Sequence, residues 1–168
     1  INPNNGGGGN APLKPANPNI VVNNPSADDI DFYKAILTGI GAPTSAENLK
    51  LCYAWRKGEG AKAAWNPFNT TQPWTGATAY NCSKTGKPLV KNYASKKDGI
   101  DATVTTLQNG NYPKIVNGLK TDIGAATIST YMDELSKWGT GDNINDALAG
   151  STLTPPSIAQ STTQIASC

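Results

Sequence analysis

LCYAWRKGEG, residues 51–60, carries a helical pattern that runs into glycine just after an acidic residue. Leu49, Cys52 and Trp55 form an apolar stripe at helical spacing, and Glu59 follows one turn beyond Trp55 on the same face. The pattern therefore puts a carboxyl group at the edge of the core. Loss of water there raises its pKa and makes it a proton donor near neutral pH. A helix end with Glu59 turned to solvent is the alternative.

The other acidic residues have structural roles in our interpretation. Acids at a helix start complement the positive end of the helix dipole, and Thr44 with Glu47 matches the capping-box pattern. Asp122 is expected to cap the helix after it. The remaining acids assigned to helix starts, polar helix faces or a polar tail are Asp28, Asp29, Asp31, Asp98, Asp133, Glu134, Asp142 and Asp146. Besides Glu59, only Asp101 is left without such a role.

The composition excludes several classes of function. The chain has 168 residues, enough for one domain with a core, and its fourteen basic and twelve acidic residues give a net charge of only +2. Arg56 is the single arginine, a poor basis for binding nucleic acid. Histidine is absent and the three cysteines are far apart, so we expect neither a metal site nor a cofactor. No apolar run approaches the length of a membrane span.

The cysteines allow two arrangements. Cys52 lies on the apolar helix face, so a buried free thiol is favoured over a disulfide between Cys52 and Cys82. Cys168 is then left over, and the redox compartment stays open. Because the chain begins at Ile1 rather than methionine, we expect a processed or excised piece of a longer protein.

The patterning predicts an α+β fold that is mainly helical, with extended ends. Residues 1–25 are rich in proline, glycine and asparagine and indicate an arm or linker, in which residues 20–22 could dock on a surface or a sheet edge. Residues 26–139 are expected to fold alone, and 140–168 to form a polar tail. Helical spacing is found at about 26–39, 45–58, 96–107, 113–119 and 125–137, and an irregular part at 60–93 is expected to contain a hairpin near 83–88.

The order of these elements resembles a known family. Glu-Gly at a helix end, then Asn-Pro-Phe-Asn-Thr-Thr (66–71), Asn-Tyr-Ala-Ser (92–95) and Gly-Ile-Asp-Ala-Thr (99–103), is similar to small lysozyme-like peptidoglycan hydrolases of phages and bacteria. Lytic transglycosylases and flagellar-type glucosaminidases are similar in turn. The resemblance covers roughly residues 45 to 120, with Phe68 where leucine is expected.

The resemblance implies a helical lobe and a small β-lobe beside a cleft, with Glu59 as the catalytic acid. It places Tyr93 near the cleft as an assisting group. Asn69, Thr70 and Thr71 then contact substrate, although those side chains could equally hold their own loop.

The chemistry expected from this resemblance uses a single carboxylate. A glycosidase with two carboxylates needs the second on the other side of the scissile bond, and no Asp or Glu lies between Glu59 and Asp98. One glutamate would then act as acid and base, helped by the substrate's N-acetyl or 6-hydroxyl group. Asp101 is the remaining candidate for a second carboxylate, and a role on the helix surface is favoured for it.

Aromatic residues in the irregular part fit a saccharide site, because aromatic faces stack on sugars. Trp65, Trp74 and Tyr80 are the candidates, and at least one of them is expected to fill the core instead. We therefore expect a domain that cleaves peptidoglycan glycan strands in a bacteriophage virion or a secreted protein, outside the cell or in the periplasm. The alternatives are a non-catalytic structural module of a phage tail, contacting other subunits through its ends, and a glycan-binding module.

Overall fold

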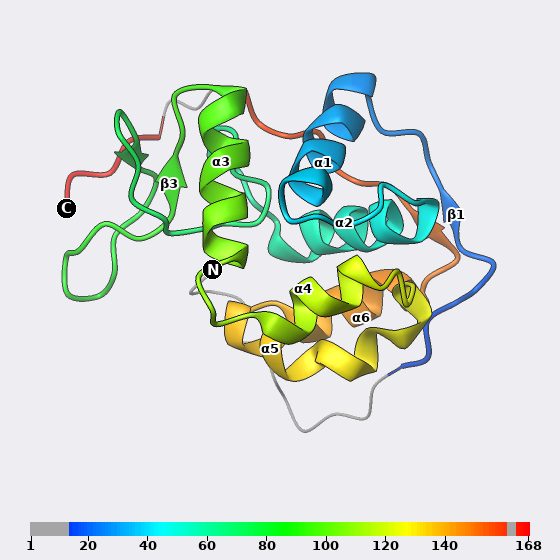
Figure 1. The fold of residues 1–168 in the computed structure, drawn as a ribbon. Coiled ribbons are helices and arrows are strands. Elements are labelled where there is room, and N and C mark those ends of the chain that lie inside the picture. Colours follow the sequence, from blue (N-terminus) through cyan, green and yellow to red (C-terminus); the bar gives the residue numbers. More distant parts are fainter. Residues whose placement is uncertain (1–13, 161–163) are drawn as a thin grey trace.

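The computed structural model describes residues 14–160 and 164–168, so residues 1–13 of the expected N-terminal arm lie outside the described part. The fold is mixed and mainly helical, as predicted (Figure 1). The helices are α1 (Ala27–Gly39), α2 (Ala46–Glu59), α3 (Lys96–Leu107), α4 (Pro113–Lys120), the 3₁₀ helix η1 (Ala125–Tyr131), α5 (Met132–Trp138) and α6 (Gly141–Ala149). The strands are β1 (Val21–Val22), β2 (Thr78–Ala79), β3 (Lys91–Asn92) and β4 (Thr152–Leu153).

Three helices begin at a serine, as the sequence indicates. The hydroxyl groups of Ser26, Ser45 and Ser95 each accept a hydrogen bond of 3.1 Å from the backbone N–H three residues later. Each bond satisfies one of the N–H groups that have no partner inside a helix. Gly60 ends α2 in the left-handed conformation (φ 56°), which glycine adopts without strain.

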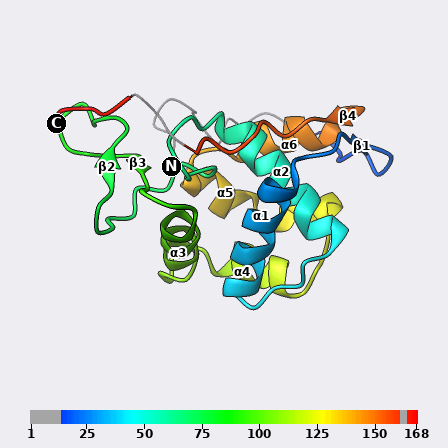
Figure 2. The ribbon, with the colours of Figure 1, turned by 90° about the horizontal axis from the view of Figure 1, so that it is seen from above.

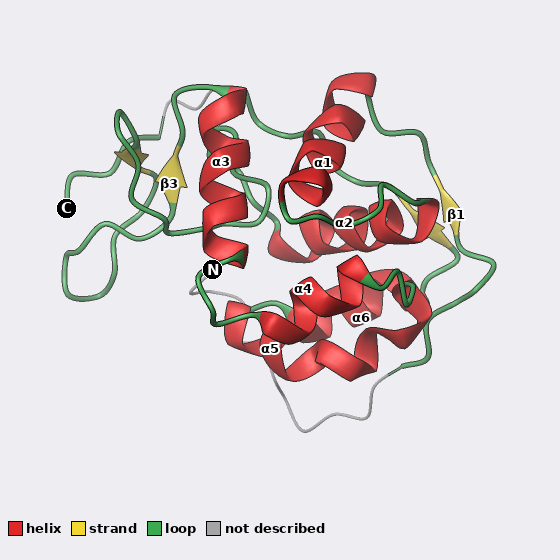
Figure 3. Cartoon of the chain, viewed as in Figure 1, coloured by secondary structure: helices red, strands yellow, loops and turns green. Residues whose placement is uncertain are grey.

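The elements form two parts joined at α3. We call α1, α2, α4, α5 and α6 the helical part and residues 61–93 the β-region. Figures 1 and 2 show strands β2 and β3 of the β-region on the other side of α3 from α1. Strands β2 and β3 pair antiparallel, and a bridge between Cys82 and Pro88 closes the predicted hairpin. Most of the β-region is loop (Figure 3).

Aromatic side chains fill the core around α2. Trp55 stacks on Phe68 with ring centroids 4.3 Å apart and meets Trp138 edge to face at 4.9 Å. All three side chains are buried, and the Trp138 indole donates a hydrogen bond of 2.7 Å to the Phe68 carbonyl. The segment that follows α2 is thereby fixed against α5.

The C-terminal segment belongs to the core, contrary to our prediction of a polar tail at 140–168. Helix α6 packs along α2 and buries Ile144 and Leu148, and the segment beyond it buries Leu153 and Ile158. Strand β4 pairs in parallel with β1, so residues 20–22 do add to a strand edge. The separate folding of 26–139 is therefore no longer expected.

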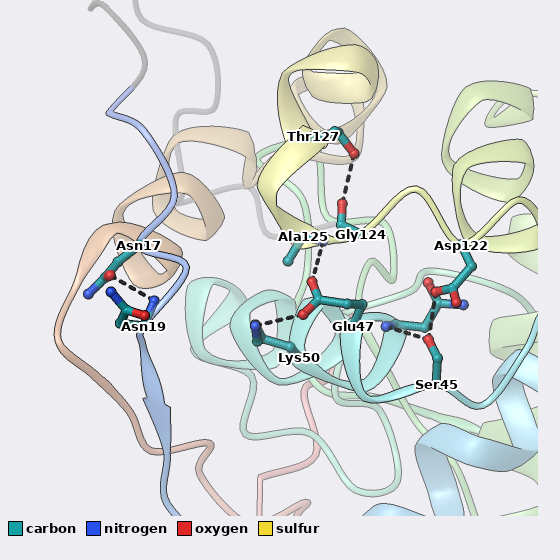
Figure 4. Close-up of polar contacts among 10 residues, drawn as sticks. Asn17, Asn19, Ser45, Glu47, Lys50, Asp122, Gly124, Ala125 and Thr127 are labelled. Atoms are coloured by element: carbon teal, nitrogen blue, oxygen red, sulfur yellow. Dashed lines mark hydrogen bonds and ion pairs between the residues drawn. The ribbon is translucent and has the colours of Figure 1, made fainter.

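Three acids have other partners than the sequence suggests, and two of them, Glu47 and Asp122, are drawn in Figure 4. Ser45 rather than Thr44 caps α2, so Glu47 is free of the capping box and accepts hydrogen bonds from Lys50 and from the Ala125 N–H. Asp122 accepts a bond from the Ser45 hydroxyl instead of capping a helix. Glu134 is buried rather than on a polar face, because its two oxygens accept the N–H groups of Lys114 and Ile115 at the start of α4.

Two cysteines that the sequence left unpaired form a disulfide, Cys82–Cys168. Cys52 is buried and free, which confirms its place on the apolar face of α2 and excludes a bond to Cys82. Among the described residues, no helix combines the length and the apolar character needed to cross a membrane.

Candidate active site

Glu59 is the last residue of α2 and is fully buried, at 0 % exposure. The Asn69 side-chain amide donates to the Glu59 carboxyl Oε2 at 2.9 Å and to the Glu59 carbonyl at 3.1 Å. Asn69 reaches both atoms from a left-handed backbone position (φ 54°), which asparagine tolerates better than most residues. The predicted orientation of Glu59 toward the core is confirmed, and the alternative with Glu59 in solvent is excluded.

Burial changes the acidity of Glu59. Loss of water around the carboxylate raises its pKa from 4.5 to about 7, and this effect outweighs the Asn69 hydrogen bond and the charge of Arg56, which both lower the pKa. A carboxyl group with this pKa is partly protonated at neutral pH. It can both donate and accept a proton there, which is what an acid–base catalyst requires.

A hollow of about 200 Å³ is lined by Gly60, which follows Glu59 in the chain, and by Asn69, which bonds to its carboxyl group. Its lining residues are Gly60, Ala61, Lys62, Asn69, Tyr80, Asn81 and Val90. Asn69 belongs to both the hollow and the Glu59 pair, so a ligand in the hollow would contact the residue that holds the acid. We call it the Asn69 hollow.

The loop that carries Asn69 is held by polar side chains of its own. Asn66 donates to the carbonyl groups of Thr70 (2.9 Å) and Lys91 (2.7 Å) and accepts from the Thr70 N–H at 2.8 Å. The Thr70 and Thr106 hydroxyl groups are 2.5 Å apart, which ties the loop to α3. Asn66 is a positioning residue that our sequence reasoning missed, although its place in the Asn-Pro-Phe-Asn-Thr-Thr run was a signal for it.

Several residues predicted to bind substrate have structural roles instead. Thr70 is fully buried, so it holds its own loop rather than contacting a substrate. Thr71 is half-buried. The Tyr93 hydroxyl donates to the Gln72 carbonyl at 2.9 Å, and burial raises the pKa of its phenol. Tyr93 thus braces the loop of the site rather than bonding to the acid.

The three aromatic residues predicted to bind sugar have different surroundings in the structure. Tyr80 lines the Asn69 hollow, as a sugar-binding residue would. Trp65 instead stacks on Phe32 of α1 at 6.3 Å, and the half-buried Trp74 donates its indole N–H to Asp98 at 3.2 Å. Gly99 of α3 lies so close to the Trp65 backbone that a Cβ would be 2.1 Å from its carbonyl oxygen. Trp65 is therefore a packing residue, as expected for at least one aromatic.

Asp101 has the surface role that the sequence favoured. It forms an ion pair with Lys97 one turn earlier on α3, and its side chain is partly exposed. Among the described residues, no group of three or more His, Cys, Asp or Glu side chains is arranged to hold a metal ion.

A second hollow, of about 240 Å³, lies where residues 16–18 cross α2 near Glu47 and Lys50. The two charged side chains pair with each other at 2.8 Å, and Glu47 also holds the Ala125 N–H (Figure 4). Mutual pairing lowers the pKa of Glu47, through the Lys50 hydrogen bond above all, and keeps this acid ionised at neutral pH. The Asn69 hollow is the better candidate because its acid can transfer a proton.

Comparison of the chain with protein-family models, with curated proteins and with solved structures gave no match.

Proposed function

We propose that this chain is a lysozyme-like domain that cleaves the glycan strands of peptidoglycan, with Glu59 as its acid–base catalyst. The observation that carries the proposal is the buried Glu59 carboxyl, with a pKa of about 7, at the end of α2 just before the β-region begins. Its place at the end of α2, beside a hollow lined by Tyr80 and Asn69, agrees with the family resemblance.

The proposed mechanism needs one carboxyl group. Protonated Glu59 gives its proton to the glycosidic oxygen while the bond from that oxygen to the sugar C1 breaks. The substrate's N-acetyl oxygen or 6-hydroxyl group forms the new bond to C1. If the 6-hydroxyl attacks, its proton goes to the Glu59 carboxylate and an anhydro sugar results, which is the lytic transglycosylase outcome. The absence of Asp and Glu from residues 60–97 supports this route over one with two carboxylates.

This mechanism requires that the substrate reach the Glu59 carboxyl group. The carboxyl group is fully buried, and the Asn69 side chain is bonded to it. A glycosidic oxygen must come within hydrogen-bond distance of a general acid. We propose that binding in the Asn69 hollow displaces the Asn69 amide from the carboxyl and brings substrate to it.

The disulfide supports a location outside the reducing cytosol. Disulfides persist in secreted, periplasmic and virion-surface proteins. Cys82–Cys168 therefore agrees with a secreted or virion-associated wall-degrading domain. Other virion or tail subunits are proposed as partners of its ends.

Glu59→Gln tests the proposal, because it keeps the shape of the side chain and removes the transferable proton. General acid catalysis is commonly worth about 10²–10⁴-fold, so release of muropeptides from purified walls should fall by at least 10²-fold. Glu47→Gln, on the same helix but beside the other hollow, is the matched control and should retain activity. Mass spectrometry of the products reports activity, the bond cleaved and anhydro ends together. Wild-type activity in Glu59→Gln would refute the catalytic role.

One observation favours a second candidate, a non-catalytic structural or glycan-binding module. Full burial and the paired Asn69 bonds could make Glu59 a packing residue at the end of α2. In that case the wild-type protein binds walls or virion subunits and releases no muropeptide.

A further inference from the structure

The last described residues, Gln164–Cys168, attach to the β-region beside the Asn69 hollow. The Ala166 N–H donates to the Ala79 carbonyl at 2.9 Å. The Gln164 side chain donates to the Tyr80 carbonyl at 2.8 Å, and the Gln164 carbonyl accepts from Asn92 at 3.0 Å. The disulfide to Cys82 completes the attachment. We call residues 164–168 the clasp.

The clasp holds a sheet that has little stability of its own. Strands β2 and β3 have two residues each, and a lone two-stranded hairpin is marginal in water. The clasp bonds to Ala79 of β2 and to Asn92 of β3, so it contacts both strands. The disulfide keeps it there, because the covalent bond limits how far the clasp can move from the strands when its hydrogen bonds open.

The clasp is attached along one side of the hollow. Tyr80 accepts the Gln164 bond through its carbonyl, and Asn81 is the neighbour of Cys82. Asn81 in turn accepts the Val90 N–H at 2.9 Å, and Val90 is a third lining residue. Movement of the clasp would therefore change one side of the hollow.

We propose that the Cys82–Cys168 disulfide is a redox-controlled clasp that sets the shape of the Tyr80–Asn81 side of the Asn69 hollow. Cys168 is exposed and Cys82 is half-buried, so a small thiol reagent can reach the bond. Reduction by a dithiol transfers two electrons and two protons, leaves two cysteine thiols and converts the reagent to its own disulfide. The site is then formed in an oxidising environment and loosened in a reducing one. The clasp itself does not depend on the proposed function, and only the identity of the ligand does.

Hydrogen exchange with mass spectrometry tests the proposal directly. Oxidised protein, protein reduced with a dithiol, and Cys168→Ser are compared over residues 78–92 and over α1 as an internal reference. We expect at least 10-fold faster exchange in 78–92 for the reduced and Cys168→Ser proteins, with α1 unchanged. Equal exchange in 78–92 for all three proteins would overturn the proposal.

A second pair of variants separates the clasp from overall stability. Gln164→Ala leaves the disulfide in place and removes the bond to Tyr80, and we expect about 3-fold faster exchange confined to the same segment. Gln160→Ala, an exposed glutamine in the preceding segment, is the matched control and should change nothing. Faster exchange spread evenly over α1 and 78–92 would mean global destabilisation and would also overturn the proposal.

Binding of a soluble peptidoglycan fragment distinguishes this inference from the proposed function. If the fragment binds the oxidised protein, its Kd should rise about 10-fold on reduction, and an unchanged Kd would overturn control of the hollow. If it binds neither form while exchange in 78–92 still depends on the disulfide, the proposed function fails and the clasp stands.

Discussion

The helical part and the β-region are held together by different interactions. In the helical part, buried rings such as Trp55 and Trp138 pack face to face or edge to face, and the C-terminal segment covers them with further apolar side chains. The β-region has two short strands, and polar side chains such as Asn66 together with one disulfide set its shape. The candidate acid lies where the two meet, at the end of α2 and against the loop that carries Asn69.

Removal of residues 140–168 should have the largest effect, because it takes away the apolar side chains that cover the core of the helical part. Burial of an apolar side chain contributes about 1.5–3 kcal/mol, so loss of Ile144, Leu148, Leu153 and Ile158 would cost on the order of 6–12 kcal/mol, as much as a whole domain is stable by. We expect the chain ending at residue 139 to show no cooperative melting by circular dichroism. Cooperative melting would show that the helical part does not depend on its C-terminal cover.

The pH dependence of stability should follow Glu59. Below pH 4.5 this group is protonated in both states, and between 4.5 and about 7 only the folded state keeps the proton. The free energy of unfolding therefore falls as pH rises through this window, by about 3 kcal/mol in total, and no further change from Glu59 is expected above it. In Glu59→Gln this part of the pH dependence should vanish, as measured by urea denaturation at pH 4, 6 and 8.

Glu47→Gln provides a control of opposite sign. The Lys50 hydrogen bond lowers the pKa of Glu47 in the folded protein. Ionised Glu47 therefore stabilises the fold above its unfolded-state pKa, and this stabilisation is lost as pH falls through its folded-state pKa. If the free energy of unfolding changed with pH in the same way for the wild type and Glu59→Gln from pH 4 to 8, the raised pKa of Glu59 would be contradicted.

Asn66→Ala should disturb the β-region more than the helical part. It leaves buried polar groups of Thr70 and Lys91 without their partner, which costs about 2–3 kcal/mol. We also expect a loss of activity, because the loop that carries Asn69 is loosened. Denaturation with urea and muropeptide release measure the two effects. Asn111→Ala, on an exposed loop, is the control, and an equal result for both variants would contradict the positioning role of Asn66.

Asp101→Asn should have the smallest effect. The ion pair with the exposed Lys97 contributes little to stability because solvent screens it, and activity should stay within about three-fold of wild type. A loss of activity as large as that of Glu59→Gln would instead make Asp101 the second carboxylate.

Local signals predicted most of the helices and the position of Glu59. Serine caps, a glycine stop and helical spacing are properties of a few neighbouring residues, so they can be recognised without the fold. The hairpin near 83–88 was recognised for the same reason. The orientation of Glu59 followed from its spacing to Trp55 on the face that packs against Phe68.

What the sequence could not provide was pairing over long separations. Helix α6 was not predicted because Ile144 and Leu148 make only a short apolar stripe in a polar stretch. Their contribution to stability depends on packing against α2, which the local sequence does not show. Cys82 and Cys168 are 86 residues apart, and three cysteines leave the pairing open. Thr70 and Tyr93 were placed at a cleft because the motif carries no information on which side chains turn inward.

The disulfide also determines how the molecule transmits a mechanical pull. Tension applied between residue 14 and Cys168 passes along the chain to Cys82 and then through the sulfur atoms, so residues 83–167 are shielded from the force. Helices α3 to α6 would stay unextended while α1 and α2 are pulled apart. Reduction would release residues 83–167, and the sequence separation of 86 between the cysteines lengthens the extended chain by roughly 300 Å at about 3.3–3.6 Å per residue. A single-molecule force trace with and without a dithiol would register this as one additional extension step.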